Sequence, residues 1–339
     1  MFDPMYKITP YMLNLIDETS ALRAWIELAP LQVAWLPVLQ KEARAKTAHF
    51  STSIEGNVLT LAQVRAVERG EPIGAAQTQE QEVANYLKAM RWIETGADNK
   101  LDENAVLQLH KIITRGLLDS SKSGRYKEKQ NWVVDENKIK VFSPTSPKET
   151  PQAVEELLDW LNNHETRQLH SILVCALFHH RFVSIHPFSD GNGRLARALG
   201  TLILYQRDYD LHHIFSLDEY FAGNRQRYYQ KLQQARALDG NLTHWIEYVA
   251  EGVVKTLKNV KARIEGLQVT ASYPVNLSPK QEEVLRILRD NPALRVAEFK
   301  DQLNVTRARV NQILTPLIKS GLVMKEGESR ATRYKLNIH

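Results

Sequence analysis

The chain has 339 residues, of which 44 are Lys or Arg and 39 are Asp or Glu, for a formal net charge of +5 at pH 7. This length suggests about two domains, and the shares of 43% hydrophobic and 24% charged residues exclude a chain that is disordered throughout. The single cysteine, Cys175, excludes a disulfide framework or a Cys-based zinc site within one chain; with no long apolar run and no signal peptide, we expect a cytoplasmic protein without a membrane partner.

Helical spacing dominates most of the chain. Apolar residues recur every three or four positions through residues 11–267, as at Leu199, Leu202 and Ile203, and this period is typical of amphipathic α-helices. The sequence therefore predicts an all-α protein, with helices over residues 11–28, 36–54, 60–69, 77–95, 102–115, 151–163, 167–184, 194–206, 217–237 and 243–267.

One hairpin is predicted to interrupt these helices. Gln130–Val134 and Lys138–Phe142 are rich in β-prone residues, and residues 135–137 between them are typical of a turn. Three prolines between residues 144 and 151 then favour an extended exit. We expect two short antiparallel strands here.

The last fifth of the chain is predicted to be a separate module. Residues 271–339 contain 12 basic and 7 acidic residues, which accounts for the whole net charge, because residues 1–270 then contain 32 of each. Helix-breaking residues at 271–278 mark the boundary. Beyond it, helices at 279–289, 296–303 and 307–319 and strands at 322–325 and 333–336 resemble the winged-helix DNA-binding domains of bacterial regulators, with Arg307, Arg309 and Arg330 as implied DNA contacts.

The residue types most typical of chemistry occur in one stretch, His186-Pro187-Phe188-Ser189-Asp190-Gly191-Asn192-Gly193-Arg194-Leu195-Ala196-Arg197. Because Pro187 disfavours helix at the residue before it, His186 is expected on a loop. Gly191 and Gly193 let backbone N–H groups turn toward an anion, and the helix expected from about residue 194 presents its free N–H groups to the same place.

Two arginines at the start of that helix indicate an anionic ligand. Arg194 and Arg197 lie three residues apart, and two cations at this end oppose the helix dipole at a cost of up to about 1 kcal/mol each. A polyphosphate would offset this cost, with Asp190 able to hold Mg²⁺ against it. His186, with an ordinary pKa of about 6.5, suits removal of a proton from a hydroxyl group. The residues alone thus indicate phosphoryl or nucleotidyl transfer.

This stretch resembles the signature of the Fic family, His-Pro-Phe-x-Asp/Glu-Gly-Asn-Gly/Lys-Arg-x-x-Arg, and matches it at every position. The resemblance implies an all-helical Fic core that transfers AMP from ATP to a Tyr, Thr or Ser hydroxyl of a target protein. Relatives that phosphorylate with inverted ATP look different, with Lys where this chain has Gly193. The resemblance therefore sides with nucleotidyl transfer.

The same resemblance assigns roles to the motif residues. His186 would be the base for the attacking hydroxyl, Asn192 and Arg194 would complete the catalytic group, and Phe188 would anchor the loop in the core. For ATP, the resemblance implies that Asp190 binds Mg²⁺ and that the α- and β-phosphates lie against Gly191, Asn192 and Gly193. Arg194 would contact the phosphates, and Arg197 would bind the γ-phosphate.

A second motif, Ser51-Thr52-Ser53-Ile54-Glu55-Gly56, ends the helix expected at residues 36–54. Glu55 lies at the negative end of that helix and Arg197 at the positive end of its own, so pairing the two would relieve both. The segment resembles the Fic inhibitory motif, Ser/Thr-x-x-x-Glu-Gly/Asn, in the subclass that carries it before the core. The resemblance implies that Glu55 takes the place of the γ-phosphate on Arg197. In some relatives this glutamate also helps to remove AMP, so the direction of the reaction stays open.

The hairpin at 130–142 resembles the family's flap, which covers the nucleotide and pairs with an extended segment of the target protein. Val133 and Val134 would then lie nearest the nucleotide. An ordinary hairpin is the alternative.

Aromatic and histidine pairs elsewhere have two interpretations each. Tyr228 and Tyr229 resemble the aromatic pair near the adenine, with a place in the helical core as the alternative, and Arg236 stands where relatives can have Asn. His179 and His180 lack acidic or Cys partners at ligand spacing, which predicts core histidines rather than a metal site.

We therefore expect four regions: an N-terminal helical region, 1–100, with the inhibitory helix at about 36–55; the Fic core, 101–240; a connecting helix, 241–270; and the winged helix, 271–339. The predicted function is an ATP- and Mg²⁺-dependent protein adenylyltransferase restrained by Glu55. The alternative is a nucleotide-sensing transcriptional regulator with a Fic fold that binds DNA. The winged helix is alternatively a protein-docking platform, and homo-oligomerisation stays open.

Overall fold

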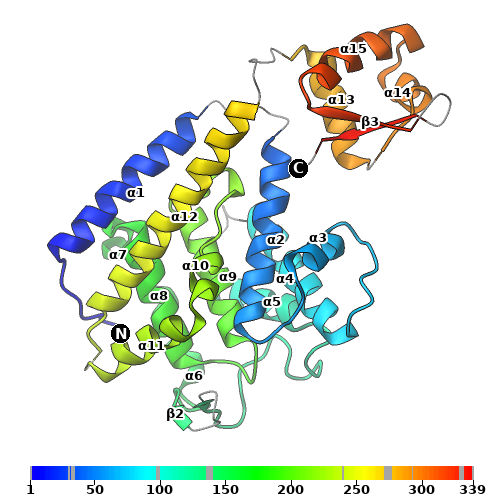
Figure 1. The fold of residues 1–339 in the computed structure, drawn as a ribbon. Helices are drawn as coiled ribbons and strands as arrows, with labels where there is room; N and C mark the ends of the chain where they lie inside the picture. Colours follow the sequence, from blue (N-terminus) through cyan, green and yellow to red (C-terminus); the bar gives the residue numbers. More distant parts are fainter. Residues whose placement is uncertain are drawn as a thin grey trace. The chain divides into compact units, whose positions relative to one another are not determined.

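The computed structural model describes residues 2–29, 31, 35–96, 100–134, 140–238, 240–270, 277–291, 293–327 and 332–337. Its contacts divide the chain into two compact units, one of residues 1–27 and 42–259, the other of residues 28–41 and 260–339. The boundaries of the division fall at the end of α1 (Pro10–Leu28) and inside α2 (Leu36–Ile54) and α12 (Thr243–Thr270). Figure 1 follows the chain through both units.

Helices form most of the regular structure up to residue 270, which confirms the predicted all-α class. Besides α2 and α12 they are α1 (Pro10–Leu28), α3 (Leu61–Glu68), α4 (Gln77–Gly96), α5 (Glu103–Thr114), α6 (Thr150–Asn162), α7 (His164–Gln168), α8 (Ser171–Ile185), α9 (Asn192–Tyr205), the 3-10 turn η1 (Leu211–His213), α10 (Asp218–Gly223) and α11 (Arg225–Ala237).

Three predicted helices differ from those observed, each because of a capping residue. The helix expected at 217–237 is broken at Asn224, whose side chain accepts a hydrogen bond from the Arg227 N–H at 2.9 Å and starts α11. The helix expected at 167–184 is preceded by the separate α7, and His170 caps α8. The helix expected from residue 194 begins earlier, because Gly191 turns the chain at a φ of +78° and serves as its N-cap.

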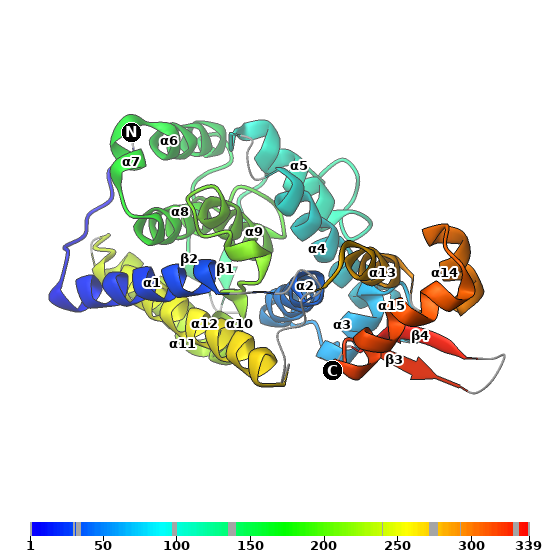
Figure 2. The same cartoon turned by 90° about the horizontal axis from the view of Figure 1, so that it is seen from above.

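The core of the first unit is built around α8 and α9, which lie side by side with α4, α5 and α6 against them (Figure 1, Figure 2). A Cβ atom added to Gly200 would be 3.4 Å from the Cys175 sulfur, so the two helices pack closely there. Cys175, His179 and His180 are buried as predicted, and burial raises the pKa of Cys175 to about 12 and lowers the pKa values of the two histidines to about 3 and 4. They are core residues.

Ion pairs hold α2 against α3 and α4. Arg44 of α2 donates to Glu68 of α3 at 2.6 Å and to Glu94 of α4 at 2.7 Å, and Arg91 of α4 also pairs with Glu68. The Arg44 and Glu68 side chains are only 13% and 4% exposed, so these charges are largely shielded from water. The network fixes the helix that carries Glu55 at its C-terminal end.

The N-terminal segment and α1 lie along α12 (Figure 1, Figure 2). The Thr9 hydroxyl donates to Glu247 at 2.6 Å, and Lys258 pairs with Glu18 at the same distance. Among the helices that the structure describes, none combines the length and apolar character that a membrane crossing requires.

The predicted hairpin is present but shorter than expected. Strand β1 (Val133–Val134) pairs antiparallel with β2 (Lys140–Phe142), with Val133 opposite Phe142 and an irregular register. The predicted turn at 135–137 lies outside the described residues.

The C-terminal module has the element order of a winged helix and a core of its own. It contains α13 (Pro279–Asp290), α14 (Val296–Leu303), α15 (Arg307–Lys319) and the antiparallel strands β3 (Val323–Glu326) and β4 (Arg333–Leu336). Leu294 exchanges two backbone hydrogen bonds with Tyr334 of β4, at 2.9 and 2.8 Å. Phe299, Val310 and Leu317 are completely buried within this module. The predicted winged-helix fold is confirmed.

Candidate active site

The loop between α8 and α9 places the motif at the start of a buried helix. His186 ends α8 in the left-handed region, at φ 51° and ψ 59°, and Pro187 follows it out of the helix. Gly191, without a side chain to cap α9, leaves the first N–H groups of that helix facing the loop. This is the anion-binding geometry that the glycines predict.

Asn192 holds the loop in shape. Its Oδ1 accepts a hydrogen bond from the Phe188 N–H at 2.9 Å, and its Nδ2 donates to the Phe188 carbonyl at 2.8 Å. The residue is 2% exposed. With Oδ1 and one N–H of Nδ2 engaged, Asn192 has its second side-chain N–H and its backbone N–H as donors for a phosphate contact.

His110 of α5 packs against the loop between α8 and α9 and holds it, a role that the sequence did not predict. The Phe188 ring is fully buried and stacks on the His110 ring with centroids 3.7 Å apart. The Gly124 N–H donates to His110 Nδ1 at 2.9 Å, so Nε2 carries the proton and donates to the Asp190 carbonyl at 3.0 Å. Burial lowers the pKa of His110 to about 4, which keeps the ring neutral. Its sequence signal was only that of an ordinary buried helix position.

Lys127 and Asn131, just before β1, hold the other side of the loop. Lys127 Nζ donates to the His186 carbonyl and to Asn131 Oδ1, both at 2.9 Å, and the Asn131 amide donates to the Phe188 carbonyl at 2.9 Å. Burial lowers the pKa of Lys127 to about 8. Nothing in the sequence distinguished these two residues, because their partners are backbone carbonyls more than 50 positions away.

The His186 ring is set up as a neutral base. Its Nδ1 lies 3.4 Å from the Val183 carbonyl, and since a carbonyl oxygen only accepts, Nδ1 carries the proton and Nε2 keeps its lone pair. Burial lowers the pKa of His186 to about 4, and the charges of Lys127 and Arg236 act in the same direction. The ring is therefore uncharged at neutral pH, as proton removal requires.

Arg197 and Glu55 form the predicted ion pair. Arg197 Nη2 lies 2.7 Å from Glu55 Oε1, and the same guanidinium donates to the Ser51 carbonyl and hydroxyl, both at 2.8 Å. Asp218 of α10 lies 3.3 Å from Arg197 Nε. The Arg197 side chain is 1% exposed. Although burial acts to lower the pKa of Arg197, Glu55 and Asp218 outweigh it and hold the pKa above its ordinary value.

The carboxylate of Glu55 also lies directly against the start of α9. A Cβ atom added to Gly193 would be 2.3 Å from Glu55 Oε1 and 3.2 Å from Arg197 Nη1. In this arrangement, the space between Gly193 and Arg197 is filled by Glu55, and an oxyanion of a ligand cannot occupy it at the same time.

Arg194 has a partner that the sequence did not indicate. Its Nη1 donates to Glu82 of α4 at 2.6 Å, while its Nη2 lies 3.5 Å from Asp190 Oδ1. The Arg194 and Glu82 side chains are 7% and 15% exposed. Glu82 gave no signal because it lies among the many polar residues of α4.

Asp190 fits a Mg²⁺ ion that is held mainly by phosphates. Its side chain is 62% exposed, and its Oδ1 accepts the Gly191 N–H at 2.6 Å. The described residues contain no group of three or more His, Cys, Asp or Glu side chains able to enclose a metal. A single carboxylate is enough for Mg²⁺ in a nucleotide complex, because phosphate oxygens and water complete its shell.

The family comparisons agree with the motif. Residues 100–204 match the Fic/DOC family, and this range includes the whole loop and the start of α9. Residues 277–328 match the MarR family, in the region of the winged helix.

Curated relatives and solved structures extend this likeness beyond the Fic domain. Proteins named "Protein adenylyltransferase Fic" from Drosophila willistoni and Nematostella vectensis are 29% and 28% identical over 222 and 253 residues, covering 64% and 73% of this chain. The matches cover only 42% and 55% of those relatives' own lengths.

Among solved structures, a Fic family protein from Desulfovibrio desulfuricans G20 covers 99% of this chain and 98% of its own at a TM-score of 0.70 and 24% identity. A Fic domain containing signaling protein from Bacteroides thetaiotaomicron covers 76% of this chain and 97% of its own at a TM-score of 0.63 and 25% identity. The fold is thus shared over nearly the full length of the chain.

Of the two neighbouring tyrosines in α11, one lies in the core and the other at the surface. Tyr228 is 1% exposed, and its hydroxyl lies 2.9 Å from His179 Nε2, among core aromatics that include Phe221 and Trp245. Tyr229 is 39% exposed. Of the two, only Tyr229 offers its ring to a ligand without rearrangement of the core.

The hairpin of β1 and β2 is attached to α11. Gln233 Nε2 donates to the Val141 carbonyl at 2.7 Å, and the Arg236 guanidinium lies over the Phe142 ring at 4.0 Å. Arg236 Nη2 also donates to the Val183 carbonyl at 3.3 Å. Arg236 therefore links β2 to the end of α8, close to the 186–197 motif. On β1, Val133 is half-buried; of Val134 the structure describes only the backbone pairing.

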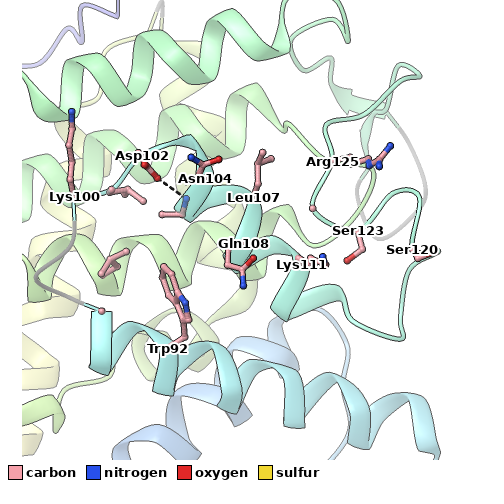
Figure 3. Close-up of a pocket in the computed structure, with 15 residues that line it drawn as sticks. Trp92, Lys100, Asp102, Asn104, Leu107, Gln108, Lys111, Ser120, Ser123 and Arg125 are labelled. Carbon is pink, nitrogen blue, oxygen red and sulfur yellow. Dashed lines mark hydrogen bonds between the residues drawn. The ribbon is translucent and has the colours of Figure 1, made fainter.

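A separate cavity of about 630 Å³ lies beside α4 and α5 (Figure 3). Trp92 and Leu101 contribute its apolar part, and Lys100, Lys111 and Arg125 bring positive charge. No residue of the 186–197 motif is among the described residues that line it. The cavity is distinct from the motif site.

The predicted DNA contacts are exposed where the structure describes them. Arg307 and Arg309 lie at the start of α15, after Thr306, whose hydroxyl caps the helix by accepting the Arg309 N–H at 3.3 Å. Arg330 lies outside the described residues.

Proposed function

We propose that this chain is an ATP- and Mg²⁺-dependent protein adenylyltransferase that its own Glu55 holds inactive. The observation that carries the proposal is the position of the Glu55 carboxylate, 2.7 Å from Arg197 and against the Gly193 backbone at the start of α9. The names of the curated relatives support the chemistry.

The proposed reaction is an in-line displacement at the α-phosphorus of ATP. The target hydroxyl oxygen forms a bond to that phosphorus, the bond from it to the bridging oxygen of the β-phosphate breaks, and diphosphate leaves. The hydroxyl proton passes to the lone pair on His186 Nε2. The free N–H groups at the start of α9 and the charge of Arg194 stabilise the negative charge on the phosphates. Mg²⁺, when bound at Asp190, supplies further charge neutralisation.

Inhibition follows because the Glu55 carboxylate and the γ-phosphate of ATP compete for the same space beside Arg197 and Gly193. Arg197 cannot turn toward the γ-phosphate while Nη2 is bonded to both Ser51 and Glu55, and the carboxylate repels a phosphate that approaches Gly193. Removing the carboxylate leaves Arg197 fixed by Ser51 and Asp218 and frees the space for the γ-phosphate. Removal of AMP by the same site stays an open direction of the reaction.

The proposed target is a protein that presents an extended segment to the flap. A segment that adds to the hairpin as a further strand binds through backbone hydrogen bonds. The Val141 carbonyl of β2 already accepts a hydrogen bond from the Gln233 side chain. Val133, Val134 and the exposed Tyr229 are the proposed contacts of the nucleotide on this side. A cytoplasmic location is part of the proposal.

Labelled ATP tests the proposal in four forms of the full chain: wild type, Glu55→Gly, His186→Ala and the double variant Glu55→Gly with His186→Ala. We expect Glu55→Gly to label itself or proteins of a lysate strongly, wild type weakly, and Glu55→Gly with His186→Ala not at all. If Glu55→Gly labels no more than His186→Ala does, the transferase proposal fails.

A second function, DNA binding by the winged helix, is favoured by the exposed Arg307 and Arg309 and by the MarR match. Phosphate contacts make DNA affinity fall with salt, at a log–log slope of about 0.9 per contact. Replacing both arginines with alanine in the full chain should weaken a DNA mobility shift and reduce that slope by about 2. A full chain that gives no salt-sensitive shift would favour protein docking instead.

A further inference from the structure

Two separate links join the segment that carries Glu55 to the two motif arginines. The first is the direct pair between Glu55 and Arg197. The second runs through Asn57, whose Nδ2 donates to Glu82 Oε2 at 2.8 Å, while Glu82 Oε1 accepts from Arg194 Nη1 at 2.6 Å. Glu82 thus uses one oxygen for each neighbour.

Further hydrogen bonds hold the Asn57 side chain in the position from which it contacts Glu82. It is 8% exposed, its Oδ1 accepts the Leu59 N–H at 3.0 Å, and its Nδ2 also donates to the Gln79 carbonyl at 3.0 Å. The turn before it depends on Gly56, whose φ is +101°. Asn57 therefore cannot leave Glu82 unless the turn after α2 also moves.

Glu82 leaves several hydrogen-bond donors of the buried Arg194 guanidinium without a close partner among the described residues. It accepts from Nη1 alone; Nη2 has only the 3.5 Å contact with the exposed Asp190, and Nε has no hydrogen-bond partner among the described residues. The Arg194 carbonyl also accepts from the Tyr86 hydroxyl at 3.4 Å, one turn further along α4. Helix α4 thus holds Arg194 at both its backbone and one edge of its side chain.

We propose that Glu82 is a positioning residue that aims Arg194 at the phosphates, and that the turn after α2 supports it through Asn57. The segment that blocks the site through Glu55 therefore also prepares it through Asn57. The inference rests on the proposed function only in the part given to Arg194. It predicts that deleting the Glu55 carboxylate and disrupting the whole turn have opposite effects on nucleotide binding.

The test measures ATP binding by calorimetry, with Mg²⁺, in Glu55→Gly protein that carries one further change. Glu82→Ala should weaken ATP binding about 10-fold, because Arg194 loses its fixed orientation. Glu82→Gln keeps an oxygen for Arg194 but sets an amide against the amide of Asn57, so it should match Asn57→Ala, each weakening binding about 3-fold. The double change Glu82→Gln with Asn57→Ala should be no worse than either alone, because both break one link. The matched control is Glu80→Ala, two residues before Glu82 on the same helix.

Transfer kinetics separate positioning from general damage. We expect the KM for ATP to rise with the loss of affinity and kcat to fall with it, because Arg194 also stabilises charge during transfer, while the melting temperature stays close to that of the Glu80→Ala control. If Glu82→Ala binds ATP as tightly as the control, the inference is overturned. Tighter binding would overturn it as well, since Glu82 would then be a second inhibitory carboxylate. Loss of all transfer in Glu55→Gly protein would defeat the proposed function but leave the binding result to decide this inference.

Discussion

Arg197 should be far more important for stability than its ion-pair partner Glu55. Asp218 is 1% exposed and lies 3.3 Å from Arg197 Nε, and its Oδ1 has no hydrogen bond from the described residues. Arg197→Ala therefore leaves a buried carboxylate without its counter-charge, a change that typically costs about 3–5 kcal/mol. For a unit of this size, each kcal/mol lowers the melting temperature by about 2–4 °C, so we expect a fall of about 6–20 °C. Glu55→Gly should cost much less, because the Glu55 side chain is 30% exposed and Arg197 keeps Ser51 and Asp218.

Thermal unfolding across pH checks the cause of this loss. Burial raises the pKa of Asp218 to about 6 even though Arg197 acts to lower it, so removing Arg197 raises the pKa further. A carboxyl whose folded pKa lies above its unfolded value of about 3.9 destabilises the fold at higher pH, and the penalty disappears as pH falls through the folded pKa. The gap between wild type and Arg197→Ala should thus narrow from pH 8 to pH 5, and Asp218→Asn should restore much of the variant's stability at pH 8. A gap that does not depend on pH, with no rescue by Asp218→Asn, would refute this reasoning.

Three further predictions concern the loop and the start of α9. In Glu55→Gly protein, the acid limb of the transfer rate should lie well below pH 6.5, because burial lowers the pKa of His186 to about 4 and the base is lost only when it is protonated; a midpoint at or above 6.5 would contradict the ring environment described. Gly193→Ala should displace the Glu55 carboxylate, because the new Cβ would lie 2.3 Å from Oε1. Glu55→Gly should therefore change the free energy of unfolding less in the Gly193→Ala variant than in wild type. We expect the two changes to differ by about 1 kcal/mol in a double-mutant cycle. Phe188→Ala should cost about 3–5 kcal/mol in urea unfolding, because the ring is fully buried and stacked on His110; a cost below about 1 kcal/mol would show that the loop does not depend on this anchor.

Helix prediction succeeded where hydrophobic spacing decided the structure and failed where a single capping residue did. The predicted helices at 36–54 and 77–95 are present almost unchanged, because their apolar positions repeat over several turns. The break at Asn224 was missed, since an Asn inside a long polar helix looks the same in sequence as an Asn that caps a new one. The start of α9 was placed two residues late, because the φ of Gly191 is a property of the folded turn.

The amino-acid order by itself determined the motif loop, its two arginines and the glutamate that opposes them. Arg194, Arg197 and Glu55 could be identified because their charges are placed at helix ends, and His186 because Pro187 places it on a loop; both are local properties of the chain. Only the tertiary structure decided which groups hold them. His110, Lys127 and Glu82 act through backbone carbonyls or single carboxylate oxygens contributed by segments 58 to 112 positions away, and no local pattern encodes such contacts. The residues of the motif can thus be identified from the sequence, whereas the orientation of each side chain depends on the packing of the helices around it.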